Sequence, residues 1–157
     1  MKLNDKILIS DIEDKQIDIE AQDIKLDIVY EDEYYILINK PSGISTMPNK
    51  SHYTKNLAGA ICNYMKDKDS NFVLRIINRL DKDTSGLILV AKSSIAQKDI
   101  QNIDKEYTAI CEGEIKQSIT INSPILTINK DGINQRKRII SPEGQTATNI
   151  VSPIQSN

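Results

Sequence analysis

A nine-residue stretch of charged and small residues places the strongest constraint on the fold. It reads Arg79-Leu80-Asp81-Lys82-Asp83-Thr84-Ser85-Gly86-Leu87. Two apolar runs flank it, at 72–77 and 87–91, and both are rich in β-branched residues and short enough to be strands. Ser85-Gly86 is a turn signal. The pattern predicts a tight connection between two buried strands, which would hold Asp81 still and keep it accessible.

The charges in this stretch allow several interpretations. Arg79 and Asp81 are two residues apart, so on an extended backbone both side chains point to the same side. The guanidinium can then keep the carboxylate ionised or reach a phosphate. Composition alone favours a solvated hairpin loop with an internal salt bridge, because charged loops are common and active sites are few. A metal site with Asp81 and Asp83 as ligands is weaker, because two carboxylates without a further acidic cluster bind magnesium or calcium poorly.

Length and composition indicate one globular domain without a membrane helix. The chain has 157 residues, 39% of them hydrophobic and 27% charged, which is ordinary for a soluble domain with its own core. No apolar run approaches the roughly 18 residues that a membrane helix needs. Residues 1–6 lack the apolar core of a signal peptide. Cys62 and Cys111 have no paired spacing, so we expect reduced, partly buried thiols in a cytoplasmic protein.

The net charge of −2 conceals a division of charge along the chain. Residues 1–33 hold 11 acidic and 4 basic residues, which gives −7, and residues 34–157 hold 11 acidic and 16 basic residues, which gives +5. A basic core is compatible with RNA binding. The acidic segment contains a short alternating run at 6–12 that predicts a strand. Residues 1–23 are therefore expected to be an acidic leader.

The stretch 78–92 closely resembles the signature of the RluA-type pseudouridine synthases, whose familiar form is His-Arg-Leu-Asp-Lys-Asp-Thr-Ser-Gly-Leu. This chain has Asn78 where many members have His. The resemblance implies that Asp81 is the catalytic residue. It also makes Arg79 the candidate to bind RNA, either by filling the space that a flipped uridine leaves or by holding a phosphate.

Two further stretches resemble motifs of the same family. Residues 28–43 contain IVYEDE and NKPSG, similar to its first conserved motif. Residues 105–113 resemble its Lys-x-Tyr-x-Ala-x-x-x-Gly motif, in which the Tyr lies against the target uracil, and this implies a catalytic-site role for Tyr107. From the residue pattern alone, Tyr107 is a half-buried strand tyrosine in a cross-strand pair. The stretch from Asp81 to Tyr107 is several residues shorter than is usual in the family.

Periodicity predicts the remaining elements. Strands are expected at 26–33, 34–40, 105–113 and 139–140, with another beginning at 144, and helices at 55–66, capped by Thr54, and at 93–102. Residues 119–125 resemble a further strand of the family. The run 87–90 is apolar on both faces and predicts a central strand of a covered sheet. Lys40 is expected to be solvated at a strand end, and His52 to lie in a surface loop. The basic run 135–138 predicts either a phosphate contact or a solvated hairpin.

The resemblance covers residues 24–152 and stops before a Thr-Gly-Arg-Thr-His-Gln-Ile-Arg motif with which family members continue. We therefore expect residues 24–157 to form a partial catalytic domain after the leader, which loosely resembles the tail of the family's small RNA-binding domain. The resemblance implies an α+β fold, a mixed and mostly antiparallel sheet with flanking helices.

The function that the resemblance implies is isomerisation of uridine to pseudouridine in structured RNA, with ribosomal RNA as the expected substrate. It needs no cofactor and no metal, in line with a sequence that has no phosphate-binding glycine loop and no ligand cluster. The alternative is a catalytically inactive RNA-binding fragment of such a synthase. The oligomeric state is open.

Overall fold

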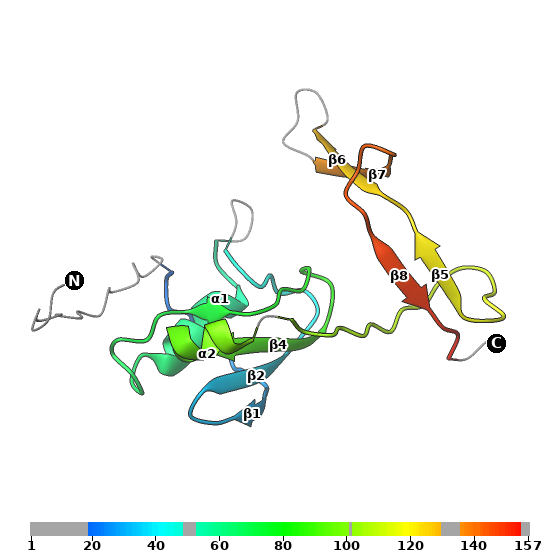
Figure 1. The fold of residues 1–157 in the computed structure, drawn as a ribbon. Helices are drawn as coiled ribbons and strands as arrows, with labels where there is room; N and C mark the ends of the chain where they lie inside the picture. The colour runs from blue at the N-terminus through cyan, green and yellow to red at the C-terminus, as the bar shows by residue number, and fades with distance from the viewer. Residues whose placement is uncertain (1–18, 49–52, 101, 130–135, 155–157) are drawn as a thin grey trace, which may run out of the picture. The chain divides into compact units, whose positions relative to one another are not determined.

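The computed structural model describes residues 19–48, 53–100, 102–129 and 136–154 (Figure 1). The chain divides into two compact units, Met1–Asp104 and Lys105–Asn157, called here the first and the second unit. Both contain antiparallel strands, and the helices that the structure describes belong to the first unit. The architecture is α+β with antiparallel sheets, as the sequence predicts.

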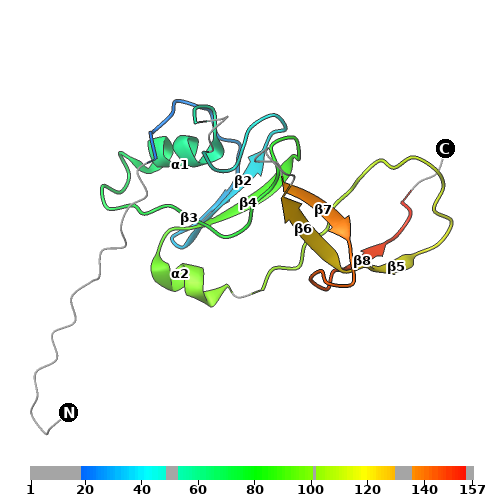
Figure 2. The same cartoon turned by 90° about the horizontal axis from the view of Figure 1, so that it is seen from above.

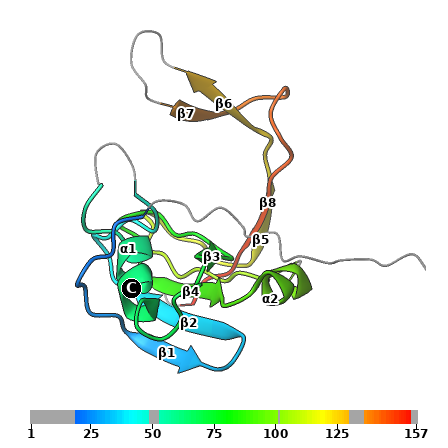
Figure 3. The same ribbon diagram turned by 90° about the vertical axis from the view of Figure 1, so that its left-hand side faces the viewer.

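The first unit is built on a four-stranded antiparallel sheet in the order β1-β2-β4-β3. Its strands are β1 (Ile28–Glu31), β2 (Tyr35–Lys40), β3 (Arg75–Ile76) and β4 (Gly86–Ala91). The β2–β4 register runs from Tyr35 opposite Ala91 to Lys40 opposite Gly86, and Figure 3 shows β1, β2 and β4 side by side. The predicted strands at 26–33 and 34–40 are therefore confirmed, with shorter bounds.

Helix α1 (Leu57–Met65) covers one face of this sheet. The core consists of alternate β2 and β4 residues packed against one side of α1, together with Phe72: Ile36, Ile38, Ile88, Val90, Leu57, Ile61 and Met65. Burying each large side chain contributes roughly 1.5–3 kcal/mol. This hydrophobic contact fixes the helix on the sheet.

The predicted cap of α1 at Thr54 is wrong. The helix is capped by Asn56, whose side chain accepts a hydrogen bond from the Gly59 amide at 2.8 Å. Lys55 has φ of 61°, a left-handed conformation in which the chain cannot continue into an α-helix. The helix therefore begins after Asn56.

Helix α2 (Ser94–Asp99) is shorter than the predicted 93–102. Ser93 caps it by accepting a hydrogen bond from the Ala96 amide at 3.1 Å, and the backbone at Ile100 is already extended. The Tyr35 hydroxyl of β2 donates to the Ala96 carbonyl at 3.0 Å. Figure 2 shows the strands lying between α1 and α2.

Strand β4 is central, as expected, with β2 and β3 on its two sides. The second face of β4 is covered only in part, because Ala91 on that face is fully buried whereas 52% of Leu87 is exposed. The predicted strand at 72–77 is reduced to the two residues of β3. Phe72, the first residue of the predicted strand, donates its amide to the Asp69 carbonyl in a turn, so that this amide is not available for strand pairing.

The second unit consists of two antiparallel pairs, one formed by β5 (Ile119–Asn122) and β8 (Thr148–Val151), the other by β6 (Ile125–Asn129) and β7 (Arg136–Ile140). A turn at 141–144 leads from β7 back to the start of β6. A Cβ at Gly144 would lie 2.4 Å from the Ile125 backbone carbon. Glycine at this position therefore permits the close approach of the two segments.

The predicted strand at 105–113 is wrong. Residues 102–113 are exposed and belong to no helix or strand of the described chain. A strand needs a neighbour to satisfy its backbone donors and acceptors, and no described strand pairs with this segment. Alternation of apolar residues alone therefore misassigned it.

Residues 19–23 of the predicted leader contact α1. Gln22 accepts hydrogen bonds from the Lys55 and Asn56 amides at 2.7 and 3.1 Å, and its own amide donates to the Gly59 carbonyl at 3.0 Å.

The strand expected at 6–12 and His52 lie outside the described residues. Cys62 and Cys111 are both unpaired. Cys62 is half-buried, but Cys111 is exposed, so the prediction of a partly buried thiol is wrong for Cys111. None of the described helices is long and apolar enough to cross a membrane.

An ion-pair cluster ties β1 to α1 and to the end of β4. Glu31 lies 2.8 Å from the Lys92 ammonium and accepts a hydrogen bond from the Tyr64 hydroxyl at 2.5 Å. Partial burial raises the pKa of the Glu31 carboxyl, but the hydrogen bonds from Lys92 and Tyr64 outweigh it, and the net pKa is lowered. Asp32 accepts the Tyr35 and Tyr34 amides, and its pKa is also lowered.

Because the pKa values of these carboxyls are lowered in the folded chain, we expect the fold to lose stability in acid. A group whose pKa is lower in the folded than in the unfolded chain stabilises the fold above its unfolded pKa, about 4.3 for Glu. That stability is lost as the pH falls through the folded pKa. Glu31→Gln should cost roughly 1–2 kcal/mol at neutral pH and flatten the fall in Tm on acidification, measured by circular dichroism. Glu33→Gln, at an exposed neighbour, is the control. Parallel wild-type and Glu31→Gln curves would contradict this assignment.

Candidate functional site

The loop between β3 and β4 carries the charged stretch, and its residues 79–85 are called here the motif loop. Its backbone is fastened just before Asp81. The Thr46 hydroxyl donates to the Leu80 carbonyl at 2.6 Å and accepts from the Leu80 amide at 3.3 Å. Thr46 is buried, so this contact is shielded from water. No motif or periodicity in the sequence predicts this role of Thr46.

The motif loop is fastened again just after Asp81. The Lys82 carbonyl accepts hydrogen bonds from the Gly43 amide at 2.9 Å and from the Lys40 ammonium at 3.1 Å. The Ser42 hydroxyl donates to the Asp83 carbonyl at 2.9 Å. All these donors belong to β2 or to the turn that follows it, where Gly43 has φ of 86°, a conformation that favours glycine.

Lys40 is the centre of this arrangement and is fully buried. Its ammonium donates to the carbonyls of Pro41, Ile44 and Lys82 at 2.9, 2.8 and 3.1 Å. A lysine ammonium has three donors, so each has an acceptor, which is what a buried charge requires. Burial lowers the pKa of Lys40, opposed in part by the carboxylates of Asp83 and Asp81.

The prediction that Lys40 is solvated is wrong. A signal for its burial exists in the sequence: Lys40 continues the alternation of Ile36 and Ile38, so the period of two places it on the inner face of β2. The three backbone acceptors could not be predicted, because they come from the turn after β2 and from a loop 42 residues away in the sequence.

Asn78, the residue just before the motif loop, joins the start of the loop to β4. Its side-chain amide donates to the Leu87 carbonyl at 2.9 Å, and its oxygen accepts from the Leu89 amide at 2.8 Å. A planar amide with a donor and an acceptor thus extends the pairing of β4 beyond β3. Asn78 therefore has a structural role in this chain, at the position where many family members have His.

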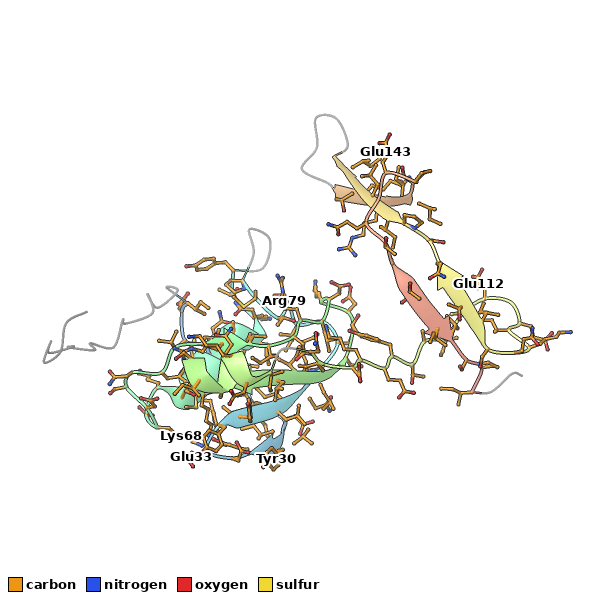
Figure 4. All side chains as sticks on the ribbon, viewed as in Figure 1. Tyr30, Glu33, Lys68, Arg79, Glu112 and Glu143 are labelled. Atoms are coloured by element: carbon orange, nitrogen blue, oxygen red, sulfur yellow. The ribbon has the colours of Figure 1, made fainter. Side chains whose placement is uncertain are left out.

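Asp81 and Arg79 both have exposed side chains on the motif loop, and Figure 4 shows Arg79 at the opposite side of the unit from Tyr30, Glu33 and Lys68. The Thr84 amide donates to the Asp81 carbonyl at 3.2 Å and forms a tight turn. The salt bridge allowed by their spacing is not formed: no ion pair joins Arg79 to Asp81 in the described residues. The loop therefore presents an accessible carboxylate and an accessible guanidinium separately.

Tyr107 lies in the second unit and is 59% exposed. Its place at the site remains a prediction. The half-buried cross-strand pair is not observed, since the segment around it is not a strand. Within the described part of the chain, no group of three or more potential ligands could hold a metal ion.

Residues 34–157 match the sequence profile of a family described as RNA pseudouridylate synthase. An uncharacterized RNA pseudouridine synthase of Bacillus subtilis is 35% identical over 164 residues, which cover 100% of this chain and 53% of that protein. Ribosomal large subunit pseudouridine synthase D of Pseudomonas aeruginosa is 35% identical over 133 residues, covering 81% and 41%. Human RNA pseudouridylate synthase domain containing 4 aligns in structure with a TM-score of 0.48 and 18% identity, covering 77% of this chain and 51% of that chain.

The chain spans about half the length of the curated relatives it matches. The profile match includes β2, the turn after it, the whole motif loop and the second unit. Together with 35% identity across the full chain, this match shows that the chain belongs to the RNA pseudouridylate synthase family, among its RluA-type members.

Proposed function

We propose that this protein isomerises uridine to pseudouridine in structured RNA, with Asp81 as the catalytic residue. The observation that carries the proposal is the motif loop, which presents the Asp81 side chain to solvent while hydrogen bonds hold the peptide groups on both sides of it. Held geometry lowers the cost of positioning a reactive group. The names of the relatives in Pseudomonas and Salmonella point to ribosomal RNA as the substrate.

The reaction requires rearrangement within one nucleotide. The bond from N1 of uracil to C1′ of the ribose breaks, the base turns, and a bond from C5 to C1′ forms. N1 gains a proton and C5 loses one, so no oxidant, reductant or metal is needed. The uridine must leave the stack, at a cost of a few kcal/mol.

The three predicted site residues then have separate roles. Asp81 promotes cleavage of the glycosidic bond, Arg79 occupies the vacated space or holds a phosphate, and Tyr107 stacks on the uracil. For Tyr107, the support is the family resemblance and its exposure.

The unpaired Cys62 and Cys111 support a reducing, cytoplasmic location. The second candidate, RNA binding without catalysis, is favoured by the absence of an ion-pair partner for Asp81 among the described residues.

Asp81→Asn should reduce pseudouridine formation by about 10²- to 10⁴-fold, the usual contribution of a positioned acid or base. The measurement is tritium release from total ribosomal RNA labelled at C5 of uracil, with RNA affinity determined in parallel. The affinity should stay close to that of the wild type, because the substitution is nearly isosteric.

Asp83→Asn makes the same change two residues along the motif loop and should keep most of the activity. Release unaffected by Asp81→Asn would refute the catalytic role of Asp81. No release by the wild-type chain, combined with firm RNA binding, would support the non-catalytic candidate instead.

Lys40→Met should destabilise the first unit and slow the reaction. The substitution keeps an apolar chain of similar length but leaves the Pro41 and Ile44 carbonyls without donors, which costs roughly 2–4 kcal/mol. Below the melting temperature, kcat should fall more than RNA affinity, because Lys40 positions the loop and does not touch RNA. Lys25→Met, at an exposed lysine, controls for loss of charge. Equal losses in Lys40→Met and Lys25→Met would refute the positioning role.

A further inference from the structure

The β6–β7 hairpin carries a concentration of positive charge that the proposed reaction does not use. Strand β7 reads Arg-Lys-Arg-Ile-Ile, strand β6 reads Ile-Leu-Thr-Ile-Asn, and neither contains an Asp or Glu. Five residue pairs join them, from Ile125 opposite Ile140 to Asn129 opposite Arg136. The first described carboxylate after β7 is Glu143, in the following turn. The two strands therefore hold three positive charges and no negative one.

Lys137 and Arg138 are both exposed. In the described ranges neither takes part in an ion pair. By contrast, Lys92 forms an ion pair with Glu31, and the Lys116 ammonium lies 3.6 Å from a carboxylate oxygen of Glu114. Their charges are therefore not neutralised by the folded chain. A surface of this kind is available to an anionic partner.

The strand geometry places one of these charges on each face of the hairpin. Neighbouring residues of a strand point to opposite faces. Lys137 stands opposite Ile128 and Arg138 stands opposite Thr127. A partner that runs past the edge or lies over either face thus meets a cation, which suits a polyanion better than a small ligand with one charged group.

We propose that Lys137 and Arg138 of the β6–β7 hairpin bind the phosphate backbone of RNA. The proposal rests on the proposed function for the identity of the polyanion and adds a second contact surface to Arg79. Phosphate contacts by Lys and Arg fix position and carry no base sequence. A-form RNA has a deep, narrow major groove that side chains cannot read, so the hairpin engages phosphates without reading bases.

The test is the salt dependence of RNA binding by the full chain. Affinity for fluorescein-labelled poly-uridine and for ribosomal RNA would be measured by anisotropy between about 50 and 200 mM salt. Each phosphate contact adds about 0.7–0.9 to the slope of log affinity against log salt. The double substitution Lys137→Ala with Arg138→Ala should lower the slope by about 1.5 and weaken binding of both RNAs.

Two controls separate this effect from unfolding and from bulk charge. Lys116→Ala removes an exposed charge of the same unit that is paired with Glu114, and it should change the slope little. Lys137→Arg with Arg138→Lys keeps both charges and should restore the wild-type slope. An unchanged slope in the alanine variant, or an equal fall in Lys116→Ala, would overturn the proposal.

A third arm identifies the polyanion. Poly-glutamate bound as tightly as RNA at equal charge, and released by the alanine variant, would assign the hairpin to an acidic protein and overturn the RNA assignment. Failure of the proposed function is distinguishable, because binding is measured without turnover. A chain that binds RNA through the hairpin but forms no pseudouridine contradicts the proposed function alone.

Discussion

The buried ammonium of Lys40 is the interaction on which the site depends. It is withdrawn from water, and its three hydrogen bonds go to backbone carbonyls, one of them in the motif loop. A charge can stay in such a place only if every donor has an acceptor. Meeting that requirement forces the turn after β2 and the motif loop together. The position of the backbone around Asp81 is thus a consequence of solvating one lysine with peptide groups.

The sheet and helix supply the frame for this arrangement. Pairing of Lys40 with Gly86 sets the end of β2 beside the start of β4, so the two segments that must meet already lie next to each other. The Ile36, Ile38, Ile88 and Val90 side chains, packed under α1, hold that register, since a slip by one residue would expose them. Thr46, in the chain between β2 and α1, adds the contact to Leu80. Core packing and site geometry are therefore coupled in the first unit.

Local pattern was enough to predict much of the first unit, and the family resemblance supplied the catalytic candidate. Short runs of apolar residues predicted β1, β2 and β4, and the charged stretch between two such runs predicted an accessible Asp81 on the connection before β4. What could not be predicted depends on contacts distant in sequence: the burial of Lys40 and the role of Thr46. The strand at 105–113 failed for the same reason, because alternation does not reveal whether a partner strand exists. Thr54 was mistaken for the helix cap since composition does not show the left-handed backbone at Lys55.

Amide hydrogen exchange, followed by NMR in wild type and Lys40→Met, tests the central claim most directly. The Gly43 amide donates to Lys82 and the Leu80 amide to Thr46, so both report on the motif loop, and the Leu89 amide, bound to Asn78, reports on β4. If Lys40 holds the motif loop, Lys40→Met removes the protection of the Gly43 and Leu80 amides while the Leu89 amide stays protected. Unchanged protection of Gly43 and Leu80 in Lys40→Met would show that the lysine does not hold the loop and would contradict the account.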